Sequence, residues 1–209
     1  NKWYHLVAIF NGTTNTASVF VDGLLQNSSA SLGLGYPTTT GTLYIGTSEG
    51  VNTWSGLIDE VKIYNYALTS DEVQLDYNKG AAMALGTLSD TSGLTGGSSA
   101  SSSATSSYCV PGDASGCSAP IGEWNFEEGS GTTAYDSSGN GKTGTWAGTS
   151  THYTSGKVGK AGNFNGTDDT VSVTGFTNSG TRTIEFWANR QNTNYVFDSG
   201  AGRFVISFG

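Results

Sequence analysis

Several features that are common in other proteins are scarce in this sequence. Only 12% of its 209 residues are charged, about half the usual fraction, and it has three Pro, two Cys and two His. No apolar run approaches the roughly 18 residues that cross a bilayer, so we expect no membrane insertion within this sequence. Nine basic against seventeen acidic residues give a net charge of -8. That charge would repel a phosphate backbone, so we expect no nucleic acid partner.

Glycine and aromatic residues are abundant instead: the chain has 31 Gly, five Trp, ten Tyr and nine Phe. Together with 35% hydrophobic residues, this supports one sizeable core or parts of two. Composition divides the chain into three segments. Residues 1–79 and 121–209 alternate strand-like runs with turns. Residues 80–120 are mostly Ala, Ser, Gly and Thr and are typical of a linker.

The first segment reads as strands followed by one helix. Residues 3–10 are apolar at nearly every position, which predicts a strand covered on both faces, and further strands are expected at 15–22, 42–46 and 57–64. Strict alternation in the last of these would place Asp59, Val61 and Ile63 on one face and Glu60 and Lys62 on the other. Thr69-Ser-Asp-Glu72 is a capping box, which predicts a short helix from there to about Tyr77.

The third segment predicts short strands at 121–126, 161–164, 170–173, 182–187 and 204–208, separated by Gly-rich turns. Many short strands with Gly-rich turns and a single helix are typical of an antiparallel β-sandwich. We therefore expect an all-β fold for both outer segments.

Two features favour an extracellular location. Cys109 and Cys117 flank a turn-forming stretch, which suggests a local disulfide and an oxidising compartment, and no further Cys or nearby His points to zinc. Asn11, Asn27 and Asn165 open glycosylation sequons. In a chain so rich in Gly, Ser, Thr and Asn, chance alone supplies several such sequons.

Catalytic signatures are absent from the sequence. The pairs Glu127-Glu128 and Asp168-Asp169 are adjacent, so on a strand they point to opposite faces and cannot flank one glycosidic bond. No G-x-S-x-G motif or Gly-rich phosphate loop occurs, and His5 lies within an apolar strand, where a packed core residue is expected. We expect a protein that is not an enzyme.

Ordered motifs in both outer segments resemble the laminin G-like, concanavalin A-like jelly-roll family in its microbial extracellular form. The closing half of such a domain is similar to residues 1–79, through Lys2-Trp-Tyr-His-Leu-Val-Ala8, Val21-Asp-Gly23 and Gly56-Leu-Ile-Asp-Glu-Val-Lys-Ile-Tyr64. The opening half is similar to residues 121–209, through Trp124-Asn-Phe-Glu-Glu-Gly-Ser-Gly131, Ala134-Tyr-Asp-Ser-Ser-Gly-Asn-Gly141, Gly156-Lys-Val-Gly-Lys-Ala161, Phe164-Asn-Gly-Thr-Asp-Asp169 and Thr183-Ile-Glu-Phe-Trp187. The resemblance implies an antiparallel jelly-roll sandwich, present as two half-domains joined by the linker.

The halves stand in reversed order, and three arrangements explain this. In the first, the sequence is a piece of a longer protein of tandem domains. In the second, it is a circular permutation that folds on itself. In the third, its halves pair with halves of neighbouring subunits. Since a half sandwich leaves strand edges bare, neither half should persist alone. We expect a non-catalytic extracellular structural or adhesion protein that assembles with copies of itself or neighbouring repeats into a surface filament or layer. The alternative is a calcium-dependent carbohydrate-binding module of a larger secreted protein.

The resemblance also implies one structural Ca²⁺ where the two halves meet. Matching the motifs residue by residue assigns it to Asp59, Glu127, Asp136 and Asn140, which offer the hard oxygens that Ca²⁺ prefers. The competing interpretation is that Asp136 forms a plain Asx turn and that local amides cap Asp59.

Glycan contact is a further hypothesis. Trp54, Trp146, Tyr153 and Tyr195 lie in or near expected loops, where an aromatic ring can stack on a sugar. The competing interpretation is that these rings fill the core and its rim, as we expect for Trp3, Trp124 and Trp187.

Overall fold

The fold is described from a computed structural model, which covers residues 2–30, 39–48, 52–81, 119–178, 180–190 and 197–198. Several predictions lie outside these residues. They are the Cys109–Cys117 disulfide, most of the linker at 80–120, the side chain at Tyr195 and the strand at 204–208.

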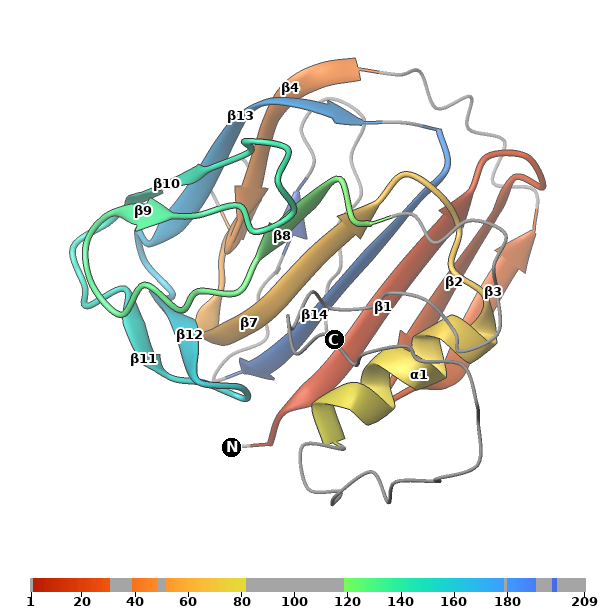
Figure 1. Cartoon of the computed structure of the whole chain (residues 1–209), viewed down its shortest axis with the longest axis horizontal. Helices are drawn as coiled ribbons and strands as arrows, with labels where there is room; N and C mark the ends of the chain where they lie inside the picture. The colour runs from red at the N-terminus through yellow and green to blue at the C-terminus, as the bar shows by residue number, and fades with distance from the viewer. Residues whose placement is uncertain are drawn as a thin grey trace, which may run out of the picture.

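Within the described residues, the larger sheet has eight antiparallel strands (Figure 1). From one edge to the other, its order is β11 (Tyr153–Ser155), β12 (Lys160–Asn165), β7 (Ser55–Tyr64), β14 (Arg182–Arg190), β1 (Tyr4–Asn11), β2 (Thr16–Val21) and β3 (Leu24–Ala30). The short strand β8 (Gly122–Trp124) also pairs with β7. The predicted strands at 3–10, 15–22 and 57–64 are thus confirmed, whereas β3 was not predicted.

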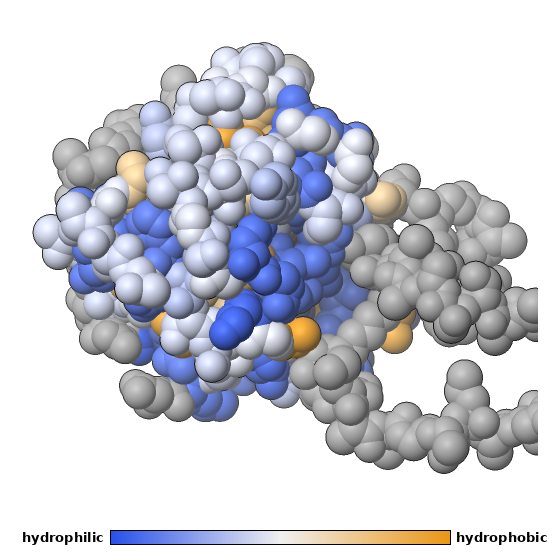
Figure 2. All heavy atoms as spheres, turned by 60° about the vertical axis from the view of Figure 1, so that its left-hand side comes forward, coloured by the Kyte–Doolittle hydropathy of each residue, from blue (hydrophilic) through white to orange (hydrophobic). Residues whose placement is uncertain are grey.

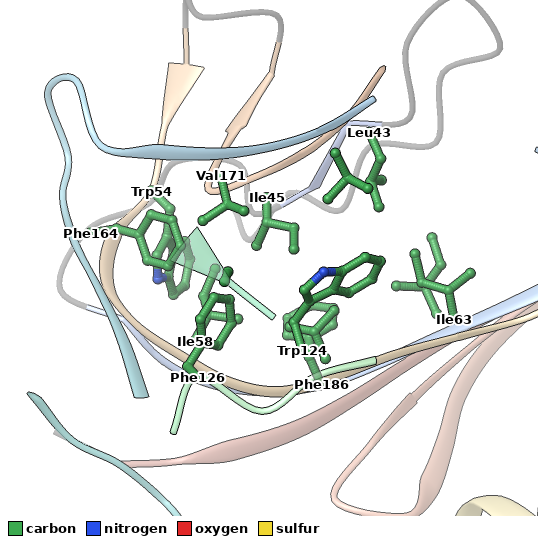
Figure 3. Packing of buried hydrophobic residues seen from close by; sticks show 14 of the residues in the cluster. Leu43, Ile45, Trp54, Ile58, Ile63, Trp124, Phe126, Phe164, Val171 and Phe186 are labelled. Carbon is green, nitrogen blue, oxygen red and sulfur yellow. The ribbon is translucent and has the colours of Figure 1, made fainter. Parts of the chain in front are cut away.

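The smaller sheet has five described strands, in the order β15 (Phe197–Asp198), β4 (Thr39–Ile45), β13 (Thr170–Asn178), β10 (Gly144–Ala147) and β9 (Thr133–Ala134). A separate hairpin joins β5 (Thr47–Ser48) to β6 (Asn52–Thr53). The larger and the smaller sheet pack face to face, and apolar side chains of both sheets lie between them (Figure 3). The protein is therefore a β-sandwich, as predicted.

Both outer segments of the chain contribute to one hydrophobic core. Ile45, Trp54 and Ile58 come from the first segment, and Trp124 and Phe186 come from the second (Figure 3). All five side chains are fully buried. The larger sheet mixes the segments in the same way, because β14 of the second segment pairs on one side with β1 and on the other with β7. In the described residues, the two outer segments therefore share this core and do not form one core each.

Strict alternation fails in the middle of β7. Glu60 has φ 52°, in the left-handed region, and the pairing of β7 with β14 shifts register between Glu185 and Trp187. This bulge lets Ile58, Val61 and Ile63 all face the core. The prediction that Asp59 and Val61 share a face was wrong, because the alternation rule holds only where no residue is added to the strand.

The helix α1 (Ser70–Ala81) covers part of the outer face of the larger sheet (Figure 1). The capping box is present: the Thr69 N–H donates to Glu72 Oε2 at 2.6 Å, and the Glu72 N–H donates to Thr69 Oγ1 at 3.3 Å. Val73 is fully buried against Tyr64 and its neighbours, which anchors the helix. The helix continues four residues beyond its predicted end at Tyr77.

Candidate functional site

Asp59 and Glu127 hold one turn, Gly156–Lys160, from different strands and loops. Asp59 Oδ2 accepts the N–H groups of Lys157 at 2.8 Å and Val158 at 3.0 Å. Both oxygens of Glu127 accept the Lys160 N–H, at 3.1 and 3.2 Å. Two of the four predicted calcium ligands, one from each segment, therefore bind the turn that joins β11 to β12.

Glycines at the turn let the carboxylates approach the backbone. A Cβ at Gly156 would lie 2.7 Å from Asp59 Oδ2, and one at Gly159 would lie 2.2 Å from Glu127 Oε1. Gly159 also has φ 52°, a conformation that other residues rarely adopt. The Gly-Lys-Val-Gly spacing of this motif is thus required by the two carboxylates and, at Gly156, also by the close approach of the Lys160 backbone.

The charge of Asp59 is poorly compensated. Its side chain is buried, and Oδ1 has no hydrogen-bond partner. Burial raises the pKa of Asp59 to about 7, against the opposing effect of the Val158 amide, and the nearby Glu60 carboxylate raises it further. Burial also raises the pKa of Glu60 to about 7, partly offset by Lys62 and reinforced by Glu123 and Glu127. A cation here would neutralise the excess negative charge.

Asp136 and Asn140 form a second, separate group. Asp136 Oδ1 accepts the N–H groups of Glu123 and Ser138, each at 3.0 Å, and Oδ2 accepts that of Lys142 at 2.7 Å. Burial alone would raise the pKa of Asp136, but these hydrogen bonds lower it below its ordinary value. Asn140 donates to the Pro120 carbonyl at 3.3 Å. This is the Asx-turn interpretation, in which both Asp136 oxygens accept backbone amides.

Among the described ranges, no group of three or more His, Cys, Asp or Glu side chains lies close enough together to hold a metal ion. The four predicted ligands are thus two pairs in this structure, and only the pair at the Gly156–Lys160 turn has an unpartnered buried oxygen. A Ca²⁺ ion at these four residues stays a prediction.

The predicted glycan-stacking rings lie inside the protein. Trp54, Trp146 and Tyr153 are 0%, 4% and 5% exposed and belong to the core between the sheets. The Trp146 indole N–H donates to the Tyr153 hydroxyl at 2.9 Å, and that hydroxyl donates to the Thr133 carbonyl. These three rings offer no face to a sugar, so their assignment as ligand-binding residues is corrected. Their large apolar area stabilises the core instead.

An exposed aromatic residue that the sequence analysis missed is Tyr135, at 63% exposure. Its N–H donates to Glu128 Oε1 at 2.6 Å. It stands at a cavity of about 510 Å³, whose lining is polar apart from Phe126 and Tyr135; the lining residues are Asn125, Phe126, Glu127, Glu128, Ser130, Tyr135 and Ser137. The sequence could have indicated this exposure, because Tyr135 directly precedes the Asp136 turn and residues next to turns are often exposed.

This side of the molecule carries β9 to β12, and hydrophilic side chains gather across it (Figure 2). Asn165 is exposed here, and its Oδ1 accepts the N–H groups of Thr167 and Asp168 at 2.8 and 3.1 Å. Asn27 is exposed on β3, and Asn11 is half-buried at the end of β1, where its Oδ1 accepts the Thr13 N–H at 3.0 Å. Glycosylation at these three sequons stays a prediction.

The residues with catalytic potential are engaged in structural contacts. His5 is fully buried with Nε2 3.2 Å from Glu185 Oε1, which agrees with the expected packed position. His152 stacks on Trp146 with ring centroids 4.6 Å apart and lies 3.8 Å from Asp169. Glu127 and Glu128 accept backbone amides in different loops, from Lys160 and Tyr135.

Comparison with known proteins gives one match. Residues 1–74 match a laminin G family model of the concanavalin A-like lectin/glucanases superfamily, which confirms the resemblance for the first segment. No curated protein matches the chain, and no solved structure does. In the part of the chain that the structure describes, no helix is long and apolar enough to cross a membrane.

Proposed function

Starting from a first segment that matches the concanavalin A-like lectin/glucanases superfamily, we propose that this protein is a non-catalytic structural or adhesion protein of the cell exterior. Its laminin G-like units are built from two complementary half-domains, residues 1–79 and 121–209, joined by the linker at 80–120. Copies of the chain, or neighbouring repeats, assemble into a filament or layer by pairing these halves.

The observation that carries the proposal is the position of β14. It lies between β1 and β7, with Ile184 opposite Ala8 on one side and Ile63 on the other. A first segment without β14 would expose two strand edges and a bare apolar face. The first segment therefore needs a second segment to cover it. A second copy of the chain carries the same β14 and can provide it as well as the chain itself.

Closure within one chain corresponds to the circular permutation considered above, and these pairings are made within one chain in the structure. Identical contacts between chains would link each copy to the next. Both outcomes make the same contacts, as in domain swapping. Chain entropy and the protein concentration determine which of the two predominates.

Calcium would strengthen this junction. Asp59 of the first segment and Glu127 of the second both reach the Gly156–Lys160 turn, so they are the residues that would hold the ion. A bound Ca²⁺ would supply positive charge to the unpartnered Asp59 Oδ1. It would thereby stabilise the contact between the segments without taking part in any reaction.

An extracellular site of action is supported by the Cys109 and Cys117 pair. The absence of enzymatic activity is supported by the engagement of His5, His152, Glu127 and Glu128 in structural contacts.

The second candidate function, a calcium-dependent carbohydrate-binding module, is favoured by the cavity beside Tyr135, where an exposed ring and carboxylates lie together. Light scattering and negative-stain images of the full chain separate the two candidates. The proposal expects multi-chain species that grow with concentration and rods or sheets with a regular repeat. A strict monomer that gives a specific glycan-array signal would replace it with the module.

A further inference from the structure

Glu185 is a buried carboxylate at the centre of the larger sheet. It lies on β14, is 2% exposed, and stands opposite Val7 of β1 and Lys62 of β7. Its Oε1 atom is 3.2 Å from His5 Nε2 and 3.4 Å from Lys62 Nζ. The acid therefore comes from the second segment, and both basic partners come from the first.

These partners determine the charge state of the carboxylate. Burial alone would raise the pKa of Glu185, but Lys62, then His5, and a hydrogen bond with the Asp76 carboxyl of the first segment lower it to about 2. Glu185 is consequently ionised in the closed sandwich at neutral pH, although its side chain is almost fully buried. An ion in such a place is strongly destabilising when its partner is removed.

We propose that the contact of Glu185 with Lys62 and His5 is the specificity determinant of pairing between the two segments, and that its partner is the first segment of this chain or of a second copy. The proposal rests on the proposed half-domain assembly. It identifies which partners the second segment accepts: those that present a cation at position 62 beside a histidine at position 5.

Strand geometry makes this contact selective for register as well as for partner. A slip of β14 by one residue would move Glu185 to the opposite face, where Ile184 and Phe186 now pack in the core. A partner strand without the cation would leave the carboxylate buried and unpaired. Apolar packing alone distinguishes such partners weakly, whereas an unpaired buried charge excludes them.

Charge exchange in the full chain tests the proposal. Glu185→Lys places two ammonium groups together, and Lys62→Glu places two carboxylates together, so each variant alone should lose roughly 10 °C or more in Tm. A 1:1 mixture of the two variants should recover a folded two-chain species by light scattering, since each first segment then finds an opposite charge on the other chain. The double variant should recover as a single chain.

A milder set of variants guards against failure to fold, because Lys62 also lies near Glu60 and Glu123. Lys62→Met, Glu185→Gln and their combination form a double-mutant cycle in Tm, and the combined loss should be clearly smaller than the sum of the single losses. Lys2→Met is the matched control, because the Lys2–Asp22 pair is exposed and lies within one segment. Its Tm should not change.

Additive losses in the cycle, or unchanged Tm in both charge-reversal variants, would overturn the proposal. A failure of the half-domain assembly looks different: the double-mutant cycle shows coupling and the double exchange folds, but the mixture gives no two-chain species. In that case the Glu185 contact specifies closure within one chain only.

Discussion

Asp59 Oδ2 accepts the amide N–H of Val158 at 3.0 Å, although the two residues are 99 positions apart in the sequence. The same oxygen accepts the Lys157 amide, so a side chain of the first segment caps a turn of the second. Replacement of either partner should therefore weaken the junction between the segments, and each of the following predictions examines a different part of it.

Asp59→Ala in the presence of chelator should destabilise the protein by roughly 3 kcal/mol, because two partly buried N–H groups lose their buried acceptor. For a chain of this size, Tm should fall by roughly 6–12 °C in calorimetry. Asp168→Ala is the control, since Asp168 is exposed and its change should have little effect. Equal effects of the two substitutions would contradict the capping role of Asp59.

Calcium should raise Tm, chelator should lower it again, and Mg²⁺ should not substitute, because Mg²⁺ demands near-ideal octahedral geometry at shorter distances and gives up its water reluctantly. Asp59→Asn and Glu127→Gln should remove the response to Ca²⁺. Asp136→Asn should lower Tm but retain the response, since the Asp136 oxygens accept backbone amides. Absence of any calcium response in the unmodified protein would eliminate the ion from this account.

Stability in chelator should rise as pH falls from about 8 to about 5. Asp59 and Glu60 have pKa values of about 7 in the folded protein, above their ordinary values of 3.8 and 4.5. The folded state therefore binds more protons than the unfolded state in this window, and its stability is lost as pH rises through 7. Asp59→Asn combined with Glu60→Gln should flatten the dependence of Tm on pH. A profile unaffected by both substitutions would show that these groups titrate normally.

Glu60→Gly should stabilise the protein by about 1 kcal/mol, because glycine adopts φ 52° without steric cost. Glu60→Val should destabilise it, since a β-branched residue is strained in the same conformation. Thermal melts of the two variants are sufficient. A lower Tm for the Gly variant than for the Val variant would mean that the bulge does not require a left-handed residue.

The sequence predicted local structure well where neighbouring residues determine it. Thr69 and Glu72 are close in the chain, so their reciprocal hydrogen bonds were predictable. The bulge at Glu60 was not, because it depends on how β7 pairs with β14, which is distant in sequence. The family resemblance implied one site for Asp59, Glu127, Asp136 and Asn140, and their arrangement in two pairs likewise depends on long-range folding.

Burial explains the errors among the aromatic residues. Trp146 and Tyr153 lie on short strands, β10 and β11, whose few residues and Gly-rich surroundings were interpreted as loops. Trp187 is buried as predicted, but on the outer face, where Lys157 Nζ lies 4.4 Å from its ring centroid. Which face of a sheet is covered depends on α1 and the second sheet, and that information is not local.

The account depends on the pairing of the two outer segments, and a cross-link across β1 and β14 tests it most directly. Tyr4 lies opposite Ala188, so the full chain carrying Tyr4→Cys and Ala188→Cys should form a disulfide between these positions, within one chain or between two, when peptides are mapped by mass spectrometry. Tyr4→Cys with Trp187→Cys is the matched control, because adjacent residues of β14 point to opposite faces. The account predicts a cross-link in the first variant and none in the second. Absence of a cross-link at positions 4 and 188, both within and between chains, would contradict it.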